Sequence, residues 1–482
     1  MLFGAVAGLF AINAAYGGSR ELFRLTERPS AKAADERSSV ASVRESEIAV
    51  DDALLPVSAT FVLPVFNGKS YTAVRSDSEG FERRGAGNIT WRGKIASGDF
   101  RGDVVITQIE KSFSALIYTP EAVYEIVPKG SRHYLVELDQ RLFPPCAGEV
   151  AGERFASVSR PGVAGDSGDR IDVLVLYTAA VRTSAGGDAQ AKTIAQQAID
   201  ATNTAYINSK IRQRVRLVGA EFTNLTETGD FSSELSNLRG DAAANARRDE
   251  LNADLVDMLT NSTAACGIGY LMGPLGGNPG NGFTVTARTC AVGNLSFAHE
   301  LGHNMGSHHN PENGGTAAYP YGYGHYVNGK FRTVMSYSNP CTSGCTRVAY
   351  FSNPMINYMD LPTGIDNQRD NARSINNTAD WIANYRYSGA GITLTNFDGN
   401  VQIPRLIEQE LKWTSNNISG DVRIDISRDE ASTWDVLVPS TPNDGSERVR
   451  IGGRATKRAR IRVVSISSPA VSDSSVSNII LK

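Results

Sequence analysis

The chain has 482 residues, which is long enough for about three domains. Hydrophobic residues make up 41% of it and charged residues 21%, a composition that suits soluble globular domains. The formal net charge of −3 gives no electrostatic reason to expect nucleic acid or an anionic membrane as a partner.

An apolar run from Leu2 to Ala15 opens the chain. It is too short and too isolated for a transmembrane anchor, and small residues follow it, so residues 1–17 are typical of a secretory signal peptide. The usual basic start is missing, because no Lys or Arg precedes Arg20, and a disordered start is the alternative. We expect a secreted protein that is made as a precursor and is not stably inserted in a membrane. The oligomeric state stays open.

Residues 18–165 form the next part, in which polar and charged residues up to position 47 predict a flexible lead. From Ile48 to Asp139 the pattern changes to short β-type runs separated by turn signals, which predicts a small β domain. A glycine-bearing stretch from 157 to 169 predicts a linker. The predicted strands are Ala59–Val65, Ile89–Ile95, Asp103–Gln108, Ser114–Tyr118, Val123–Val127 and Tyr134–Leu138.

Residues 170–388 alternate between strand-type and helix-type patterns, which predicts a twisted mixed sheet with helices against it. Gly269–Met272 and Phe283–Ala287 flank a glycine-rich loop. We expect one of them to be the edge strand on which an extended substrate would pair. The predicted strands are 171–178, 215–222, 253–259, 267–272 and 283–287, and the predicted helices are 189–211, 230–238 and 366–387.

Residues 299–309 read H-E-x-x-H-x-x-G-x-x-H and organise this part of the chain. His299 and His303 are four residues apart, so on a helix they share one face and can bind one zinc ion. Gly306 is expected to end the helix, because glycine accepts the left-handed conformation. The chain can then double back and bring His309 as a third ligand. Three histidines leave a fourth position for water, which is typical of a catalytic zinc site.

Glu300 lies on the same predicted helix and can reach a water molecule in that fourth position as a general base. His308 has the wrong spacing for the third ligand, and we interpret it as a neighbour of the site. The alternative is a helix with solvated histidines, but the full pattern is too specific for chance to favour it.

Thr333–Tyr337 resembles the Met-turn of the metzincin metalloproteases, in which a methionine forms an apolar floor under the three histidines. Met335 would be that methionine; taken alone, it would be an ordinary core residue. In the astacin and serralysin branches a tyrosine two residues later lies near the metal, and Tyr337 matches its position. The resemblance implies that Tyr337 stabilises the oxyanion or ligates the metal, and a buried tyrosine with a local partner is the alternative.

The resemblance covers residues 171–387 and is closest to the reprolysin-like group, in particular the bacterial peptidyl-Asp metallopeptidases. Reprolysins usually carry an acidic residue after the third histidine, where this chain has Asn310, and they usually lack the tyrosine after the Met-turn. The resemblance implies cleavage on the amino side of aspartate. Arg347 follows the Met-turn, where metzincins build the pocket for that side chain, and we hypothesise that it binds the carboxylate. A surface arginine is the alternative.

The β-rich region before this protease-like part resembles a propeptide. Cys146 follows two prolines near its end, which partly matches the cysteine switch of several metzincin propeptides. A thiolate in the water position would hold the enzyme latent until the segment is removed. An idle or structural cysteine is the alternative.

The other four cysteines are Cys266, Cys290, Cys341 and Cys345. A bond from Cys266 to Cys290 would close a loop across the glycine-rich segment, and one from Cys341 to Cys345 would close a tight loop after the Met-turn. Three pairings of four cysteines are possible, and the spacings do not choose among them. A cysteine-ligated zinc site is disfavoured, because no C-x-x-C pair is present.

Residues 392–482 alternate in the strand manner and predict a C-terminal β-sandwich. Such an appendage usually serves surface attachment, substrate engagement or stability. The chain thus reads as a secreted zinc metalloendopeptidase acting on protein or peptide substrates. A secreted zinc hydrolase of another class and a non-catalytic protein that binds through the β-sandwich are the alternatives, and the intact Glu300 argues against the latter.

Overall fold

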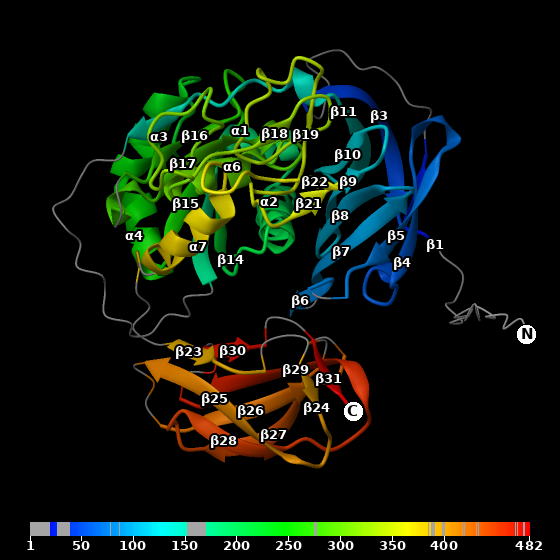
Figure 1. The fold of residues 1–482 in the computed structure, drawn as a ribbon, viewed down its shortest axis with the longest axis vertical. Helices are drawn as coiled ribbons and strands as arrows, with labels where there is room; N and C mark the ends of the chain where they lie inside the picture. The colour runs from blue at the N-terminus through cyan, green and yellow to red at the C-terminus, as the bar shows by residue number, and fades with distance from the viewer. Residues whose placement is uncertain are drawn as a thin grey trace, which may run out of the picture.

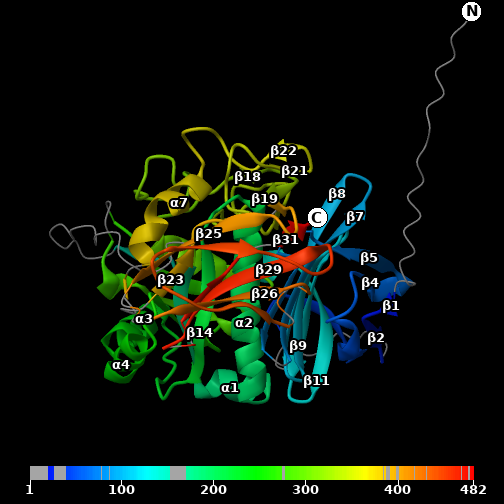
Figure 2. The same ribbon diagram turned by 90° about the horizontal axis from the view of Figure 1, so that it is seen from below.

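The computed structural model describes residues 20–26, 39–151, 170–273, 277–386, 391–397 and 401–482, apart from positions 78, 86, 384, 417, 419, 430, 432, 468, 470, 476 and 477. Figure 1 shows a β-rich N-terminal part beside a central part of sheet and helices, with β sheets of the C-terminal part below them. In Figure 2, which is seen from below, the C-terminal sheets lie in front. This order of parts was predicted. The predictions for residues 1–17 and for the linker at 157–169 lie outside the described residues.

The N-terminal part is one strongly curved sheet of eleven strands in the order β1-β4-β5-β7-β8-β9-β10-β11-β3-β2, with β6 beside β7. Strands β7 to β11 form a meander in which each strand pairs with the next, because short turns join them. All six predicted strands are present. The strands are β1 (Arg20–Glu21), β2 (Phe23–Leu25), β3 (Ser42–Val50), β4 (Thr60–Pro64), β5 (Ser70–Arg75), β6 (Phe81–Gly85), β7 (Asn88–Ser97), β8 (Phe100–Ile109), β9 (Ser112–Tyr118), β10 (Val123–Lys129) and β11 (Arg132–Leu138).

The prediction of a flexible lead up to residue 47 is wrong for the described part of that segment, because β1, β2 and the first half of β3 lie there. The charged residues that suggested a lead are paired across strands. Arg44 of β3 faces Glu137 of β11 in register, and its Nε donates to the carboxylate at 2.8 Å. The sequence of such a polar strand resembles that of a loop, because its pattern shows the charges but not the partner strand that pairs with them.

Both faces of the N-terminal sheet are covered where it meets the central part. Strand β9 is buried along its whole length. Ala115 and Ile117 join the internal core of the N-terminal sheet, whereas Leu116 and Tyr118 on the opposite face join the core of the central part. The alternating side chains of one strand therefore hold the two parts together.

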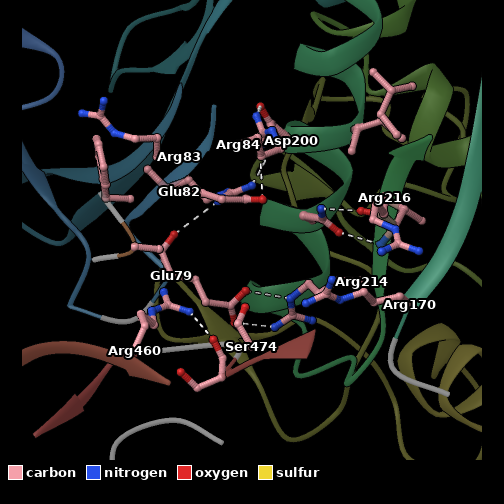
Figure 3. Close-up of a pocket in the computed structure, with 18 of the residues that line it drawn as sticks. Glu79, Glu82, Arg83, Arg84, Arg170, Asp200, Arg214, Arg216, Arg460 and Ser474 are labelled. Atoms are coloured by element: carbon pink, nitrogen blue, oxygen red, sulfur yellow. Dashed lines mark hydrogen bonds and ion pairs between the residues drawn. The ribbon is translucent and has the colours of Figure 1, made fainter. Parts of the chain in front are cut away.

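Asp200 of helix α2 (Asp188–Asn208) anchors the N-terminal sheet to the central part (Figure 3). Its buried carboxylate accepts hydrogen bonds from the hydroxyls of Thr90 and Thr107 at 2.5 and 2.6 Å. The guanidinium groups of Arg84 and Arg92 donate to it at 3.2 Å each. These four donors belong to the N-terminal sheet, and a fifth, the side chain of Gln196, comes from α2 itself. The carboxylate is therefore satisfied mainly across the interface.

A cavity of about 800 Å³ lies where the three parts meet, and half of the residues that line it are charged (Figure 3). Glu79 of the N-terminal part accepts two hydrogen bonds from Arg214 of the central part, at 2.7 and 2.9 Å. Arg170 of the central part pairs with Asp473 of the C-terminal part at 3.1 Å. The cavity is therefore bordered by ion pairs that cross between the parts.

Glu125 of β10 is buried where the N-terminal sheet meets the backbone of Gly293, and burial raises the pKa of its carboxyl to about 8. The folded pKa lies above the ordinary value of 4.5, so the folded protein binds the proton more tightly. Stability should therefore fall as the pH rises from 4.5 to about 8, and then level off.

We expect Glu125→Gln to stabilise the full chain at pH 9 by on the order of 5 kcal/mol and to have little effect near pH 4. Chemical denaturation of both proteins at the two pH values measures this difference. Glu110→Gln is the matched control, because Glu110 is an exposed glutamate in the turn between β8 and β9 of the same sheet. An equal effect of Glu125→Gln at both pH values would show that ionisation of this carboxyl is not the cause.

The central sheet is mixed, as predicted, in the order β12-β16-β17-β15-β13-β14, and only β16 and β17 are antiparallel. Strand β16 lies at the end of the central part's own strands, and β12 from the N-terminal region covers it. Of the two candidates for the edge strand, β16 therefore occupies that place. The strands are β12 (Glu149–Ala151), β13 (Arg170–Tyr177), β14 (Arg214–Phe222), β15 (Leu255–Thr260), β16 (Gly267–Leu271) and β17 (Phe283–Ala287).

Helices lie against this sheet, and short strands carry the chain after the histidine motif (Figure 1). The short helices α1, α4 and α5 were not predicted. The helices besides α2 are α1 (Ala179–Ala185), α3 (Phe231–Gly240), α4 (Ala242–Glu250), α5 (Arg288–Ala291), α6 (Ser296–Asn304) and α7 (Asn371–Ile382). The short strands are β18 (Tyr326–Val327), β19 (Phe331–Arg332), β20 (Thr346–Arg347), β21 (Asn357–Tyr358) and β22 (Leu361–Pro362).

The C-terminal part consists of a sheet β23-β25-β28 and a sheet β24-β31-β29-β26-β27, with β30 beside β29. Trp413 of the first sheet and Ile424 and Ile461 of the second belong to one core. In the described ranges, no helix is long and apolar enough to span a membrane. The strands are β23 (Gly391–Leu394), β24 (Gln402–Ile403), β25 (Glu408–Asn416), β26 (Val422–Ser427), β27 (Asp435–Thr441), β28 (Ser446–Arg450), β29 (Thr456–Ser465), β30 (Ser472–Ser474) and β31 (Ile479–Leu481).

Candidate metal centre

Helix α6 carries His299, Glu300 and His303, and all three side chains are buried. The helix ends where the sequence predicts, because Gly306 has a φ of 77° and turns the chain back. The returning segment brings His309 to the other two histidines. The three imidazoles predicted as ligands therefore come from one helix and the turn that ends it.

The nitrogen atoms of the three histidines converge on one point with a sulfur atom. One ligand-type atom from each of Cys146, His299, His303 and His309 lies within 4.8 Å of the others. The Nε2 atoms of His299 and His309 are 3.2 Å apart. The ring centroid of His303 is 4.8 Å from that of His299 and 4.7 Å from that of His309.

The outer nitrogens of the two helical imidazoles are held by backbone carbonyls. Nδ1 of His299 lies 2.9 Å from the carbonyl oxygen of Val334, and Nδ1 of His303 lies 3.0 Å from that of Ser307. A proton donated from Nδ1 leaves the lone pair on Nε2, where the rings converge. Nε2 of His303 is buried and has no hydrogen-bond partner among the described residues. Such an orphaned acceptor fits a position that a cation fills.

Burial lowers the pKa of each of these imidazoles. The pKa of His303 falls to about 4, and the nearby His308 contributes to the shift. The pKa values of His299 and His309 are lowered further, again chiefly by burial. All three rings are thus neutral near pH 7, which is the form that binds a metal ion. Three neutral nitrogen donors can hold a divalent cation.

Glu300 lies beside this cluster with its carboxyl fully buried, and burial raises its pKa well above the ordinary value. Its Oε1 accepts a hydrogen bond from the Cys146 thiol at 3.3 Å, and its Oε2 has no partner among the described residues. A side chain added at Gly267 of β16 would clash with this carboxylate at 2.5 Å. Gly267 thus leaves the space that Glu300 occupies.

Met335 lies directly beneath helix α6, as the Met-turn resemblance implied. A side chain added at Gly302 would lie 2.5 Å from the Met335 sulfur, so the two elements meet in van der Waals contact. The ring of Tyr337 has its centroid 4.1 Å from that of His309. Asn310, which departs from the reprolysin pattern, accepts a hydrogen bond from the Tyr337 backbone N–H at 2.9 Å. Its amide therefore positions the turn that carries the tyrosine.

The segment from Pro145 to Ala151 lies along strand β16. Cys266 N–H donates to the Pro145 carbonyl at 2.9 Å, and Ala147 N–H donates to the Gly267 carbonyl at 2.8 Å. Strand β12 then pairs parallel to β16. These bonds place Cys146 over the metal cluster. Burial and the neighbouring carboxylate raise the pKa of its thiol, whereas a bound cation would favour the thiolate.

His308 does not belong to the cluster of Cys146, His299, His303 and His309, and instead forms a second group with Glu149 and His309. Its Nδ1 accepts a hydrogen bond from the His309 N–H at 2.8 Å, and its Nε2 lies 3.1 Å from Oε1 of Glu149. The other oxygen of Glu149 lies 3.7 Å from Nδ1 of His309. Glu149 belongs to β12, so the N-terminal region contacts the histidines through a carboxylate as well as through Cys146. Glu149 belongs to no motif that the sequence reveals.

Arg347 is buried, and it lines a cavity of about 300 Å³ that also contains His299 and Glu300. Its guanidinium donates to the carbonyl oxygens of Asn294 and Ser336 at 2.9 and 3.2 Å. The surface alternative for this arginine is therefore wrong. The Gln140 side chain bonds both the N–H and the carbonyl of Arg347, so the N-terminal region also covers this cavity.

The four remaining cysteines form two disulfides, Cys266–Cys290 and Cys341–Cys345. The first joins Cys266, which directly precedes β16, to helix α5, and α5 comes shortly before the metal-binding helix α6. The second closes the loop between the Met-turn and Arg347. Cys146 is the free cysteine. The sequence left three pairings open, because which pairs lie close together depends on the fold.

The profile of Reprolysin_5, described as Metallo-peptidase family M12, matches residues 167–352. A peptidyl-Asp metalloendopeptidase of Stenotrophomonas maltophilia (strain K279a) is 31% identical over 349 residues, which cover 66% of this chain and 81% of that protein. The enzyme of the same name from Xanthomonas campestris pv. campestris is 28% identical over 66% of this chain and 80% of its own length. The one from Pseudomonas fragi is 31% identical over 38% of this chain and 99% of its own length.

The relatives are metalloendopeptidases, and in this chain the three histidines form a buried cluster beside Glu300. The alternative of a non-catalytic binding protein is therefore excluded. The chain belongs to the reprolysin-like group of metallopeptidase family M12 and is an endopeptidase.

Proposed function

We propose that this chain is the precursor of a secreted zinc metalloendopeptidase. The observation that carries the proposal is the convergence of three neutral imidazoles beside a buried carboxyl group. Nitrogen donors in a set of three, with a thiol as the fourth neighbour, suit zinc better than calcium or magnesium, which prefer oxygen. His299, His303 and His309 would hold the ion in the mature enzyme.

When bound there, zinc supplies a Lewis acid that polarises the substrate carbonyl and lowers the pKa of a water molecule. Glu300 accepts the proton of the attacking water and passes it to the leaving amine. Burial raises the pKa of this carboxyl, so it takes up a proton more readily than an exposed carboxylate does. The Tyr337 hydroxyl stabilises the oxyanion, a role that its ring contact with His309 supports.

The N-terminal region, residues 18–165, acts as a propeptide after removal of a signal peptide at 1–17. The hydrogen bonds of Pro145–Ala151 to β16 occupy the sheet edge on which a substrate would pair. Cys146 then lies where its thiolate can fill the fourth zinc position and keep the precursor latent. Cleavage after this segment would make both the fourth zinc position and the edge of β16 accessible to a substrate. Residues 170–388 form the protease domain.

The mature enzyme cuts on the amino side of aspartate. The names of the relatives support this specificity, since they are peptidyl-Asp metalloendopeptidases. Arg347 binds the aspartate carboxylate, and its burial beside Glu300 in one cavity supports that role. The C-terminal residues 392–482 form a β-sandwich that serves attachment, substrate engagement or stability, and catalysis needs none of its side chains.

Incubation of the mature protein with casein tests the proposal, with and without a zinc chelator, followed by mapping of the cut sites. We expect the chelator to abolish cleavage and added zinc to restore it, because the proposed mechanism requires a zinc ion on the three histidines to activate the water. Aspartate should follow most cuts. A folded, zinc-loaded and propeptide-free protein that leaves casein intact would contradict the proposal, whereas cuts without aspartate would contradict only the specificity.

A further inference from the structure

A second arginine lies next to Arg347 in the cavity beside Glu300. Arg332 ends β19 and Arg347 ends β20, and the two residues are paired in register in parallel strands. Side chains at such paired positions leave the ladder on the same face. Both guanidinium groups line the cavity of about 300 Å³, and the residues are 4% and 5% exposed.

The two guanidinium groups share the same fixed acceptors. Ser336 supplies a carbonyl that accepts from Arg332 Nη1 at 2.8 Å and from Arg347 Nη2 at 3.2 Å. Asn294 accepts from Arg332 through its side chain at 3.5 Å and from Arg347 through its carbonyl at 2.9 Å. The heads of the two arginines are therefore held side by side before any substrate arrives. Such preorganisation favours a ligand that needs both groups in place.

Neither arginine of this pair forms an ion pair among the described residues. No carboxylate lies within 4.0 Å of either guanidinium, and the Nε atoms of both are buried without a partner. Glu300 is the only acidic residue among those that line the cavity, and the N-terminal residues that cover it are Gln140, Phe143, Pro144, Pro145 and Cys146. Two buried cations side by side are costly unless an anion joins them.

We infer that Arg332 is a second specificity-determining residue, and that Arg332 and Arg347 together form the site for one acidic side chain of the substrate. The inference rests on the proposed cleavage on the amino side of aspartate and adds a residue to that specificity. A carboxylate has two oxygens and about four acceptor positions, so it can bind N–H groups from both arginines. A neutral side chain of the same shape would leave both cations unpaired. The site is therefore selective for charge.

Four variants of the mature enzyme test this inference: Arg332→Met, Arg332→Lys, Arg347→Met and Asn294→Asp. Three peptides that differ only in the residue after the scissile bond (Asp, Asn or Ala) serve as substrates. We expect Arg332→Met to lower kcat/KM for the Asp peptide by on the order of 10–100-fold, and to leave the Ala peptide within about threefold. Arg347→Met should do the same, and Arg332→Lys should retain part of the preference.

Asn294→Asp keeps the shape of the side chain and places a carboxylate beside Arg332, so it tests the site without removing an arginine. This internal anion should lower the Asp/Asn ratio of kcat/KM. The ratio stays measurable even if Arg332→Met does not fold. Arg373→Met is the matched control, because Arg373 lies on α7 and does not line the cavity.

The outcomes separate the two ideas. A wild-type enzyme that shows no preference for Asp would overturn the proposed specificity before any variant is made. A wild type that prefers Asp, with Arg332→Met or Asn294→Asp retaining the full Asp/Asn ratio, would overturn the role of Arg332 alone. Equal losses on all three peptides would show that Arg332 has a purely structural role, and this too would overturn the inference.

Discussion

Replacing Glu300 by glutamine in the mature enzyme should lower kcat by roughly 10²–10⁴-fold while the zinc content stays the same. Glutamine has the shape of glutamate but cannot accept the proton of the attacking water. The space for the side chain is already defined, since Gly267 leaves room for it and the helix fixes its backbone. His299 and His303, which flank it on α6, should continue to hold the metal. The loss should therefore fall on kcat, with KM almost unchanged.

Hydrolysis of a fluorogenic peptide and metal analysis of the same preparation measure the two quantities. Glu312→Gln is the matched control. Glu312 lies in the loop after the third histidine and accepts a hydrogen bond from the Asn310 side chain at 2.9 Å, but it does not line the catalytic cavity. We expect this control within about threefold of wild type, as for a surface substitution. A Glu300→Gln enzyme that retained a tenth of wild-type kcat at full zinc occupancy would rule out Glu300 as the general base.

The geometry of the histidine cluster could be predicted from the sequence because its spacing is local. A helix of known pitch places His299 over His303, and one glycine determines where the chain turns back. Met335 and Tyr337 were predicted from the resemblance, and both lie at the cluster. In all these cases, short-range geometry or a named motif carries the information.

Residues that reach the site from far along the chain could not be predicted in the same way. Glu149 contacts His308, and Gln140 contacts Arg347, only because the N-terminal sheet packs on the central part. Arg332 belongs to no motif, and its position beside Arg347 follows only from the pairing of β19 with β20. The first strands were missed for a related reason, since the charges of β3 are neutralised by a strand that comes about ninety residues later. Pairings between distant segments depend on topology, which a single sequence does not contain.

The second large effect concerns latency. Replacing Cys146 by serine in the uncleaved precursor should raise its peptidase activity by on the order of 10–100-fold, because a hydroxyl is a much weaker zinc ligand than a thiolate. The gain should stop short of the mature level. The backbone hydrogen bonds of Pro145 and Ala147 to the β16 edge, and the contact of Glu149 with His308, remain in this variant. The thiol and the strand are thus separate barriers, and only one of them is removed.

Self-cleavage could produce the same gain, so access to the metal must be measured in a chain that cannot process itself. In a Glu300→Gln background, Cys146→Ser should increase the affinity of the precursor for a small hydroxamate, which binds zinc directly. Ala147→Ser is the control, because it changes the same segment and leaves the sulfur in place. If the hydroxamate bound both precursors equally well, the thiol would not occupy the metal. Latency would then rest on the β16 strand alone, and disrupting the β12–β16 pairing would activate the precursor while Cys146 stayed intact.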